Sequence, residues 1–261
     1  MRFDIMTLFP DLMETILSES IIGKARRNGI IEIEAHNIRD YSQRKHRHVD
    51  DSPYGGGMGM LIAADVVHEC YKDITAKYGD AKVIYMSPQG ETLTQKKCEE
   101  LSREEHIIVL CGHYEGVDQR VLDMIVDEEI SIGDYVLTGG ELACAVLIDA
   151  AGRLIDGVLS DSECHEKESI SSGLLEYPQY TRPETYEGQS VPEILLSGHH
   201  ANIEHWRLMR SLEKTYEKRA DLYDKFTART DLTKDEKKAI ALFQKSLEDK
   251  TTDIELQENQ V

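Results

Sequence analysis

Three short apolar segments in the first 140 residues each run directly into a loop that contains glycine. They lie at 83–90, 107–116 and 130–140, about one strand plus one helix apart. This alternation predicts an α/β fold with a parallel sheet. In such a sheet the loops after the strands gather at one edge, where α/β proteins bind ligands. Backbone N–H and C=O groups of the three loops could therefore hold a polar, adenine-bearing cofactor.

The amino-terminal pattern predicts a strand, a helix and a second strand. Residues 3–9 are apolar, and a helical stripe starts at Asp11, with Glu14 as its capping-box partner, and stops at Gly29. Apolar and charged residues alternate over 31–35, which indicates a half-buried strand.

Further helical patterns lie between and after the apolar segments. Helices are predicted at 65–78 and at 92–104, the second with Thr92 and Gln95 as its cap. Residues 141–150 are apolar nearly all round, which predicts a buried helix. Because this helix follows the third loop directly, its first N–H groups should point into the ligand site.

The composition changes at 161–177, which is rich in Ser and Glu and has little periodicity. This stretch is predicted to be a mobile linker. Two helices are predicted beyond it, at 200–218 and from a capping box of Thr233 and Glu236 to Leu247. The simplest interpretation is a second, small α-helical domain. The predicted boundaries are 1–160 for the first domain, 161–177 for the linker and 178–261 for the helical domain.

The overall composition is that of a soluble globular protein, with 30% charged and 40% hydrophobic residues. No apolar run approaches the roughly 18 residues of a membrane span, and no signal-peptide h-region is present, so a cytoplasmic protein is expected. The net charge of −19 argues against nonspecific nucleic-acid binding over the whole surface. Residues 36–48 differ, with four Arg or Lys and three His against one Asp. This basic island is either a local anion site or a solvated loop.

Several familiar sites are missing from the sequence. The five cysteines never form C-x-x-C, which argues against a zinc site or a disulfide framework and favours reduced, buried thiols. Neither G-x-G-x-x-G nor a P-loop motif occurs, so dinucleotide and triphosphate binding have no usual signature. His199, His200 and His205 have no convincing ligand partners, and no metal site is predicted.

An ordered set of motifs over residues 1–215 resembles the bacterial tRNA (guanine-N1)-methyltransferases. One such match would be weak, but the set in this order is specific. It consists of Asp4–Pro10, Asn37–Asp40, Val49–Asp51, Pro53–Gly57, the three glycine-bearing loops, Gly173–Pro178, Tyr180–Glu184 and Leu196–His199.

The resemblance implies an activity and an architecture that composition and periodicity do not show. Members of this family methylate the guanine immediately 3′ of the anticodon (position 37) with S-adenosylmethionine. The implied fold is an α/β sheet tied in a deep trefoil knot (the SPOUT type), joined by a flexible linker to a small helical tRNA-binding domain. The family works as a homodimer whose active sites are shared between subunits, and a dependence on Mg²⁺ is possible.

The resemblance also implies which residues contact the cofactor. In this family it lies bent within the knotted loops, which explains why no Rossmann fingerprint is expected. Each glycine taken alone could instead mark a strand end. The implied contacts are Tyr85, Met86, Ser87, Pro88, Gln89, Gly112, Tyr114, Glu115, Ser131, Ile132, Gly133, Asp134, Tyr135, Val136, Leu137, Thr138, Gly139 and Gly140.

Two catalytic residues follow from the resemblance by position. The family base is an aspartate in the linker, and the matching position is Glu168, a departure that lengthens the side chain by one methylene. Glu166 is the nearest substitute and Asp161 a weaker one; Glu168 could also be a solvated linker charge. Arg153 matches an arginine that acts on the guanine, although it could simply form a salt bridge at the end of its helix.

Other positions match the substrate side of the family. Four glycines within five positions cannot form a helix, and they suit the close approach of a flipped base. Phosphate contacts are plausible along the basic island and at Arg207, Arg210 and Lys214, with a solvated surface as the alternative. The implied substrate residues are Asp50, Gly55, Gly56, Gly57, Gly59, Arg39 and His199.

Three other functions compete with this one. A knotted methyltransferase acting on ribosomal RNA is disfavoured by the glycine loop together with Tyr180–Glu184. An RNA-binding protein that lost catalysis through the change at Glu168 would bind cofactor without methylating tRNA. A nicotinamide-dependent oxidoreductase is disfavoured because its fingerprint is missing.

Overall fold

The computed structural model describes residues 1–159 and 168–258, with side chains to residue 249. The chain divides into two compact units, Met1–Ser162 and Glu163–Val261. No helix in the described ranges is both long enough and apolar enough to cross a membrane.

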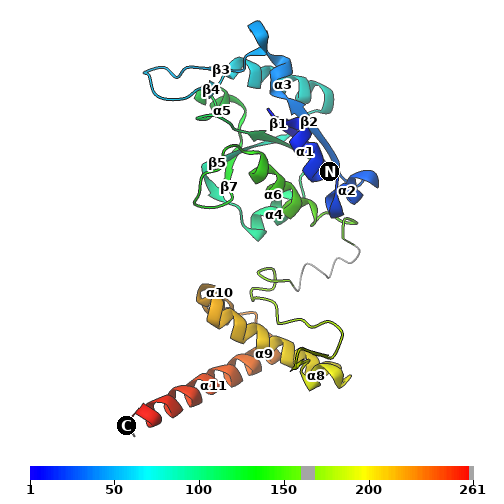
Figure 1. The fold of residues 1–261 in the computed structure, drawn as a ribbon, viewed down its shortest axis with the longest axis vertical. Coiled ribbons are helices and arrows are strands. Elements are labelled where there is room, and N and C mark those ends of the chain that lie inside the picture. The colour runs from blue at the N-terminus through cyan, green and yellow to red at the C-terminus, as the bar shows by residue number, and fades with distance from the viewer. Residues whose placement is uncertain (160–167, 259–261) are drawn as a thin grey trace. The chain divides into compact units, whose positions relative to one another are not determined.

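The first unit contains a five-stranded sheet in the order β2-β1-β6-β5-β7, and every neighbouring pair is parallel (Figure 1). This confirms the predicted parallel α/β sheet. The central strand β6 is buried at every residue, as expected for a sheet covered on both faces. The strands are β1 (Arg2–Thr7), β2 (Glu32–Asn37), β5 (Lys82–Thr92), β6 (His106–Cys111) and β7 (Glu128–Ser131).

Helices cover both faces of this sheet and enclose two apolar cores. Alternate β6 residues divide between them, with Val109 in one core and Leu110 in the other. One face carries α1 (Pro10–Leu17), α2 (Ser20–Arg27), α4 (Gln95–Leu101) and α6 (Glu141–Gly152). The other face carries α3 (Ala64–Tyr78), α5 (Gln119–Ile125) and the short turn η1 (Ile38–Tyr41).

The single amino-terminal helix predicted from Asp11 to Gly29 was wrong, because the structure has two helices there. The chain breaks after α1, and Ser20 takes a left-handed conformation with φ of 56°. A Cβ at Gly23 would lie 1.9 Å from the carbonyl oxygen of Ser18, so glycine permits the tight join. The helix starts with Pro10 in its first turn, which supplies a helical φ without a capping side chain, rather than with the predicted Asp11 cap.

Local sequence signals predicted some of the other helices correctly and missed others. The helices predicted at 65–78 and 200–218 are confirmed as α3 and α9 (His200–Lys218). Thr92 was the wrong cap for α4, because β5 continues through it and the side chain of Thr94 accepts the Lys97 N–H instead. The short helix α5 and, in the second unit, α10 (Ala220–Thr227) were not predicted.

The second unit packs α9 against α10 and α11 (Lys234–Glu258) around a core that includes Leu212 and Phe226. The predicted capping box is confirmed: Glu236 accepts the Thr233 N–H at 2.7 Å, and Thr233 Oγ1 accepts the Glu236 N–H at 3.2 Å. Before α9 lie the hairpin β8 (Thr185–Tyr186) and β9 (Gln189–Ser190), and the short helix α8 (Glu193–Leu196).

The cysteines agree with the prediction of reduced, buried thiols as far as they are described. Cys70, Cys98, Cys111 and Cys144 are all free and buried, while Cys164 lies outside the described residues. A hydrogen bond with Cys144, together with burial, raises the pKa of Cys111 well above its ordinary value. Such thiols are protonated and unreactive at neutral pH.

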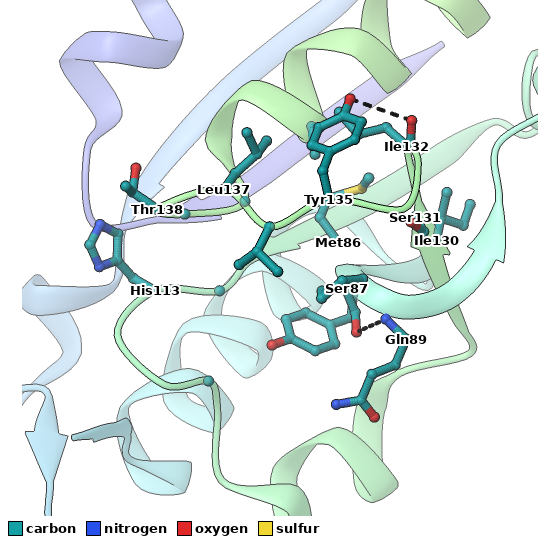
Figure 2. Close-up of a pocket in the computed structure, with 18 of the residues that line it drawn as sticks. Met86, Ser87, Gln89, His113, Ile130, Ser131, Ile132, Tyr135, Leu137 and Thr138 are labelled. Atoms are coloured by element: carbon teal, nitrogen blue, oxygen red, sulfur yellow. Dashed lines mark hydrogen bonds between the residues drawn. The ribbon is translucent and has the colours of Figure 1, made fainter. Parts of the chain in front are cut away.

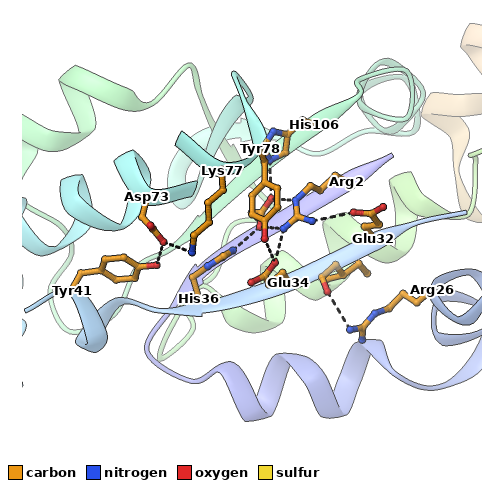
Figure 3. Close-up of polar contacts among 12 residues, drawn as sticks. Arg2, Arg26, Glu32, Glu34, His36, Tyr41, Asp73, Lys77, Tyr78 and His106 are labelled. Carbon is orange, nitrogen blue, oxygen red and sulfur yellow. Dashed lines mark hydrogen bonds and ion pairs between the residues drawn. The ribbon is translucent and has the colours of Figure 1, made fainter. Parts of the chain in front are cut away.

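The buried carboxylate of Asp4 organises the polar edge of β1, and Figure 3 labels its partners Arg2, His36 and His106. Asp4 is fully buried and accepts hydrogen bonds from Arg2 at 2.6 and 2.7 Å, from His36 at 2.5 Å and from His106 at 2.8 Å. Burial alone would raise the pKa of Asp4, but these hydrogen bonds and the charge of Arg2 outweigh it and lower the pKa to about 2. Asp4 therefore joins three strands, β1, β2 and β6.

The lowered pKa of Asp4 predicts an acid-dependent loss of stability. Because the carboxylate is favoured in the folded state, its contribution is full above the unfolded pKa near 4 and disappears as the pH falls toward 2. The advantage of wild type over Asp4→Asn in free energy of unfolding should therefore shrink by about 2 kcal/mol between pH 6 and pH 2. Urea unfolding followed by far-UV circular dichroism measures it.

The matched control is Glu32→Gln, which removes an exposed partner of the same arginine. Its effect should stay within about 1 kcal/mol at every pH. A pH-independent gap between wild type and Asp4→Asn would contradict the assignment.

Candidate functional site

A cavity of about 250 Å³ opens at the bulge of β5 and beyond the carboxyl ends of β6 and β7 (Figure 2). The three glycine-bearing loops form its walls, as their pattern predicted. Every predicted cofactor contact lines it except Asp134. Sequence reasoning missed His113, Gly116, Ile130 and Ala143, although the first three lie inside the segments that it had identified.

The first wall is a bulge in β5. Both Met86 and Glu91 pair with Ile130 of β7, so the intervening residues 87–90 loop out of the ladder. The Ser87 hydroxyl accepts the Gln89 N–H at 3.2 Å and holds the bulge (Figure 2). Just before the bulge, Tyr85 faces Gly112, and burial raises the pKa of the Tyr85 hydroxyl.

The second wall is the loop that follows β6. Tyr114 has a left-handed φ of 59°, and its N–H donates to Nδ1 of His113 at 2.9 Å. A neutral His113 would then carry its proton on Nε2. His113 also packs against Phe9, with ring centroids 5.1 Å apart.

The third wall, residues 131–140, closes on the second. The Gly140 N–H donates to the Gly112 carbonyl at 2.8 Å, and a Cβ at Gly140 would lie 2.9 Å from Cys111 Cα. Only glycine allows this approach. Tyr135 bends back toward the Ile132 carbonyl at 3.5 Å (Figure 2), and Val136 is 84% exposed at the rim.

A buried carboxylate supports the third wall from below. Glu141, the first residue of α6, is buried, and its Oε1 accepts a hydrogen bond from the Thr7 hydroxyl at 2.8 Å. Thr7 Oγ1 in turn accepts the Phe9 N–H at 2.9 Å. The first bond connects the end of β1 to the start of α6, and the second fixes the Thr7 hydroxyl against the chain that follows β1. They hold in place the helix terminus on which Gly139 and Gly140 rest.

The glycine-rich loop lies beside the second wall. It joins β3 (Asp50–Asp51) to β4 (Leu61–Ile62), two antiparallel strands that pair Asp50 with Ile62. Gly59 has φ of 83°, and a Cβ there would lie 2.3 Å from the side chain of Glu115. The Glu115 N–H also donates to the Met60 carbonyl at 3.0 Å. The structure thus brings the predicted guanine loop next to the predicted cofactor loop.

The rest of that loop is open and conformationally unusual. Gly55, Gly56 and Gly57 all have positive φ, which β-carbon-bearing residues rarely adopt. Tyr54 and Met58 are almost fully exposed. The loop therefore presents backbone groups and two large apolar side chains.

The basic island is partly neutralised by acids within its own unit. Arg44 pairs with Asp65 at 3.0 Å, and Arg47 pairs with Asp40 at 2.7 Å. Arg39 instead reaches the Tyr114 hydroxyl at 3.4 Å, at the rim of the cavity. These intramolecular ion pairs leave less positive charge for an anion, so the structure favours the solvated-loop alternative over a local anion site.

Arg153 lies at the opposite end of α6 from the cavity. Its N–H closes the helix by bonding to the Asp149 carbonyl at 3.2 Å. The helix has 12 residues, so its two ends are about 18 Å apart. Within one chain the predicted arginine does not line the cofactor cavity.

Glu168 and His199 belong to the second unit. The Glu168 carbonyl accepts hydrogen bonds from the N–H and the hydroxyl of Ser172, at 3.3 and 3.2 Å, and Leu174 anchors the turn in the helical core. His199 is exposed and precedes the first turn of α9, its N–H bonded to the Ser197 hydroxyl at 3.2 Å. Glu166 and Asp161 lie outside the described residues.

One cluster in the described ranges has ligand atoms close enough for a metal ion, namely Asp4, Glu34 and His36. The Arg2 guanidinium already bonds Asp4 and Glu34, and its positive charge opposes a cation there. The cluster is not part of the cavity lining.

The fold and cavity define a class: an α/β protein that holds a small ligand beyond the ends of parallel strands without a dinucleotide fingerprint. Comparison with known families is specific. Residues 1–225 match the family described as tRNA (Guanine-1)-methyltransferase TrmD. The chain belongs to this family.

Individual relatives are similar in sequence to this chain over nearly their whole length. A tRNA (guanine-N(1)-)-methyltransferase of Ruminiclostridium cellulolyticum is 58% identical over 86% of this chain and 97% of its own. The protein of the same name from Lachnospira eligens is 56% identical over 87% and 96%. The one from Clostridium botulinum strain Langeland is 51% identical over 95% and 100%.

The bond between Thr7 and Glu141 predicts a matched pair of variants. Thr7→Val should lower the free energy of unfolding by about 1–3 kcal/mol, because it leaves a buried carboxylate oxygen without its donor. Ligand affinity at the cavity should fall as well, because the start of α6 loosens. Urea unfolding and calorimetric titration with S-adenosylhomocysteine test both effects.

Thr7→Ser keeps the hydroxyl and is the control. It should retain most of the ligand affinity of wild type. Equal affinities for the valine and serine variants would show that this bond does not position the third wall.

Proposed function

We propose that this enzyme transfers a methyl group from S-adenosylmethionine to N1 of guanine 37 in tRNA. The main observation in support is the cavity, in which three loops meet at one sheet edge in a chain of the TrmD family. The second unit is proposed to bind the tRNA.

The cavity suits S-adenosylmethionine by its shape and chemistry. Gly112 and Gly140 allow the second and third loops to pack closely, and both glycines present backbone groups in the cavity lining. Ile130, Leu137 and Ala143 provide an apolar wall for an adenine ring. The bound cofactor would supply an electrophilic methyl group. Mg²⁺ dependence stays a prediction, since Glu115 is the one carboxylate in the described lining.

The two catalytic residues would act on the guanine. N1 carries a proton and becomes nucleophilic only when that proton leaves. The Glu168 carboxylate would accept it, and Arg153 would stabilise the negative charge that develops on O6. Glutamate has a pKa similar to that of the family's aspartate but reaches one methylene further.

The position of Arg153 supports a site shared between two copies of the chain. About 18 Å of helix separates it from the cavity of its own chain. In an antiparallel pair of α6 helices, the partner's Arg153 could approach the cofactor instead. This arrangement would explain the family's homodimer.

The surface of α6 is consistent with such a pair. Residues 141–150 were predicted to be buried all round, but Leu142 and Val146 are 53% and 46% exposed. Leu12 and Ile16 form a similar stripe on α1, which packs against α6. Exposed apolar side chains on two packed helices are typical of a protein interface. A second copy would bury them.

We also propose that the connection between the strands of the sheet is knotted. Support comes from the close packing of Gly140 on Cys111 and from the β5–β7 pairing, which place the third loop against the second. Such threading would fix the loops that form the cavity.

Glu168→Gln and Arg153→Ala test the proposed chemistry. Each should abolish turnover of tRNA while leaving cofactor affinity within a few fold, because neither residue lines the described cavity. Transfer of a labelled methyl group to tRNA transcripts with and without guanine 37 measures turnover. Glu168→Asp, the conservative control, should retain activity.

If Glu168→Gln methylates tRNA at the wild-type rate, Glu168 is not the base. Cofactor binding by the unmodified protein without methylation of any tRNA would favour the alternative of an RNA-binding protein that has lost catalysis.

A mixture of two inactive variants tests the shared site. Gly112→Val should block the cavity, because an added Cβ meets the Tyr85 hydroxyl at 2.8 Å while the backbone needs no left-handed φ. Mixed with Arg153→Ala, it should restore about a quarter of wild-type activity after random exchange of subunits, since one site in each mixed dimer is intact.

Each variant alone should remain inactive and dimeric by analytical ultracentrifugation. If the mixture is as inactive as its components while exchange is complete, both groups act from the same chain.

A further inference from the structure

The second unit contains a cavity of its own, about 940 Å³ in volume. One wall is the segment 177–184, another comes from residues around α8, and the third is the first half of α9. Its volume is within the range of small-molecule sites. The catalytic residues Glu168 and Arg153 and the substrate residue His199 are not among its lining residues.

Three aromatic rings give this cavity flat surfaces. Tyr180 is 48% exposed, and its ring lies 6.5 Å from that of Trp206, tilted by 50°. The guanidinium of Arg207 lies 4.9 Å from the centre of the Tyr177 ring. Aliphatic contacts from Val191 and neighbouring residues complete the apolar lining.

Two arginines against one acid, Glu184, make the cavity lining suited to an anionic ligand with a ring. Arg207 pairs with Glu204 through one terminal nitrogen at 2.7 Å, but its buried Nε has no hydrogen-bond partner among the described residues. Arg182 is exposed in the wall, and no acid in the described part of the chain pairs with it. A purely apolar ligand would leave the exposed donors of Arg182 unused.

We propose that this cavity binds an unpaired nucleotide of the RNA substrate, other than the guanine that is methylated. Its base would stack on Trp206 and Tyr180, and its phosphate would contact Arg182. Proteins recognise single-stranded RNA in this way, by aromatic stacking together with Arg contacts. The proposal rests on the proposed function. It adds a second point at which the enzyme holds the loop that contains its target.

Trp206 is the only tryptophan of the chain, so its fluorescence reports directly on the cavity. An anticodon stem-loop RNA titrated into the full-length protein should quench this emission. Tyr180→Ala and Arg182→Gln should each raise the KM for tRNA by about 5- to 100-fold. The kcat at saturating tRNA and the affinity for S-adenosylhomocysteine should not change.

The matched control is Tyr186→Ala, an exposed tyrosine of the β8–β9 hairpin that does not line the cavity. Its KM should stay near that of wild type. Tyr180→Phe, which keeps the ring, should also bind normally.

Abasic substitutions along the RNA loop identify the bound nucleotide. Removing the base at one position besides guanine 37 should weaken binding of the RNA to the wild-type protein. The same abasic substitution should change the RNA affinity of Tyr180→Ala little, because this variant has already lost the stacking contact.

Three results would overturn the proposal. The first is an equal KM for tRNA in Tyr180→Ala and Tyr186→Ala. The second is that abasic substitutions weaken RNA binding at the same positions in wild type and in Tyr180→Ala. The third is that Tyr180→Ala dissociates a dimer of the protein. The last would show that the cavity holds a second copy of the chain. Methylation of tRNA by wild type, measured in the same series, separates failure of this proposal from failure of the proposed function.

Discussion

The candidate site depends on one close backbone contact, the packing of Gly140 against the end of β6. The Gly140 N–H bonds to the Gly112 carbonyl at 2.8 Å, and no β-carbon could fit between them. This contact sets the start of α6 and holds the third loop over the sheet edge. Without it, the cavity would lose one wall, and backbone groups would face water rather than a ligand. Glu141 and Thr7 support the same point from beneath.

The same helix would connect ligand binding to the proposed assembly of two chains. Its first turn belongs to the cavity, its exposed stripe is apolar, and Arg153 closes its far end. A single chain therefore separates the methyl donor from the arginine by the length of α6. Two chains packed along this helix would bring the methyl donor of one chain close to the arginine of the other. Dimer formation would then be required for chemistry as well as for stability. The second unit would then contribute both the base, Glu168, and a surface for the RNA.

Predictions from sequence were most reliable where the signal is local. The Thr233–Glu236 capping box depends on two side chains three residues apart, and the predicted bounds of α3 differ from the structure by one residue at its start. The amino-terminal helix shows the limit of such signals, because its apolar stripe continues across a break that tight packing at Gly23 imposes. Thr94 replaced Thr92 as a cap because pairing with β7 extended β5. In both cases a tertiary contact overrode a plausible local pattern.

The sequence alone determined the alternation of strands and helices, the three loops that meet at one edge, and the family motifs that point to methyl transfer. These follow from hydrophobic spacing, from glycine positions and from chemistry carried in order along the chain. Only the tertiary structure decided that Gly59 lies against Glu115, that α6 exposes an apolar stripe, and that aromatic residues from 177 to 206 form a second cavity. Such features depend on contacts between residues far apart in the chain, and no periodicity within a single segment specifies them.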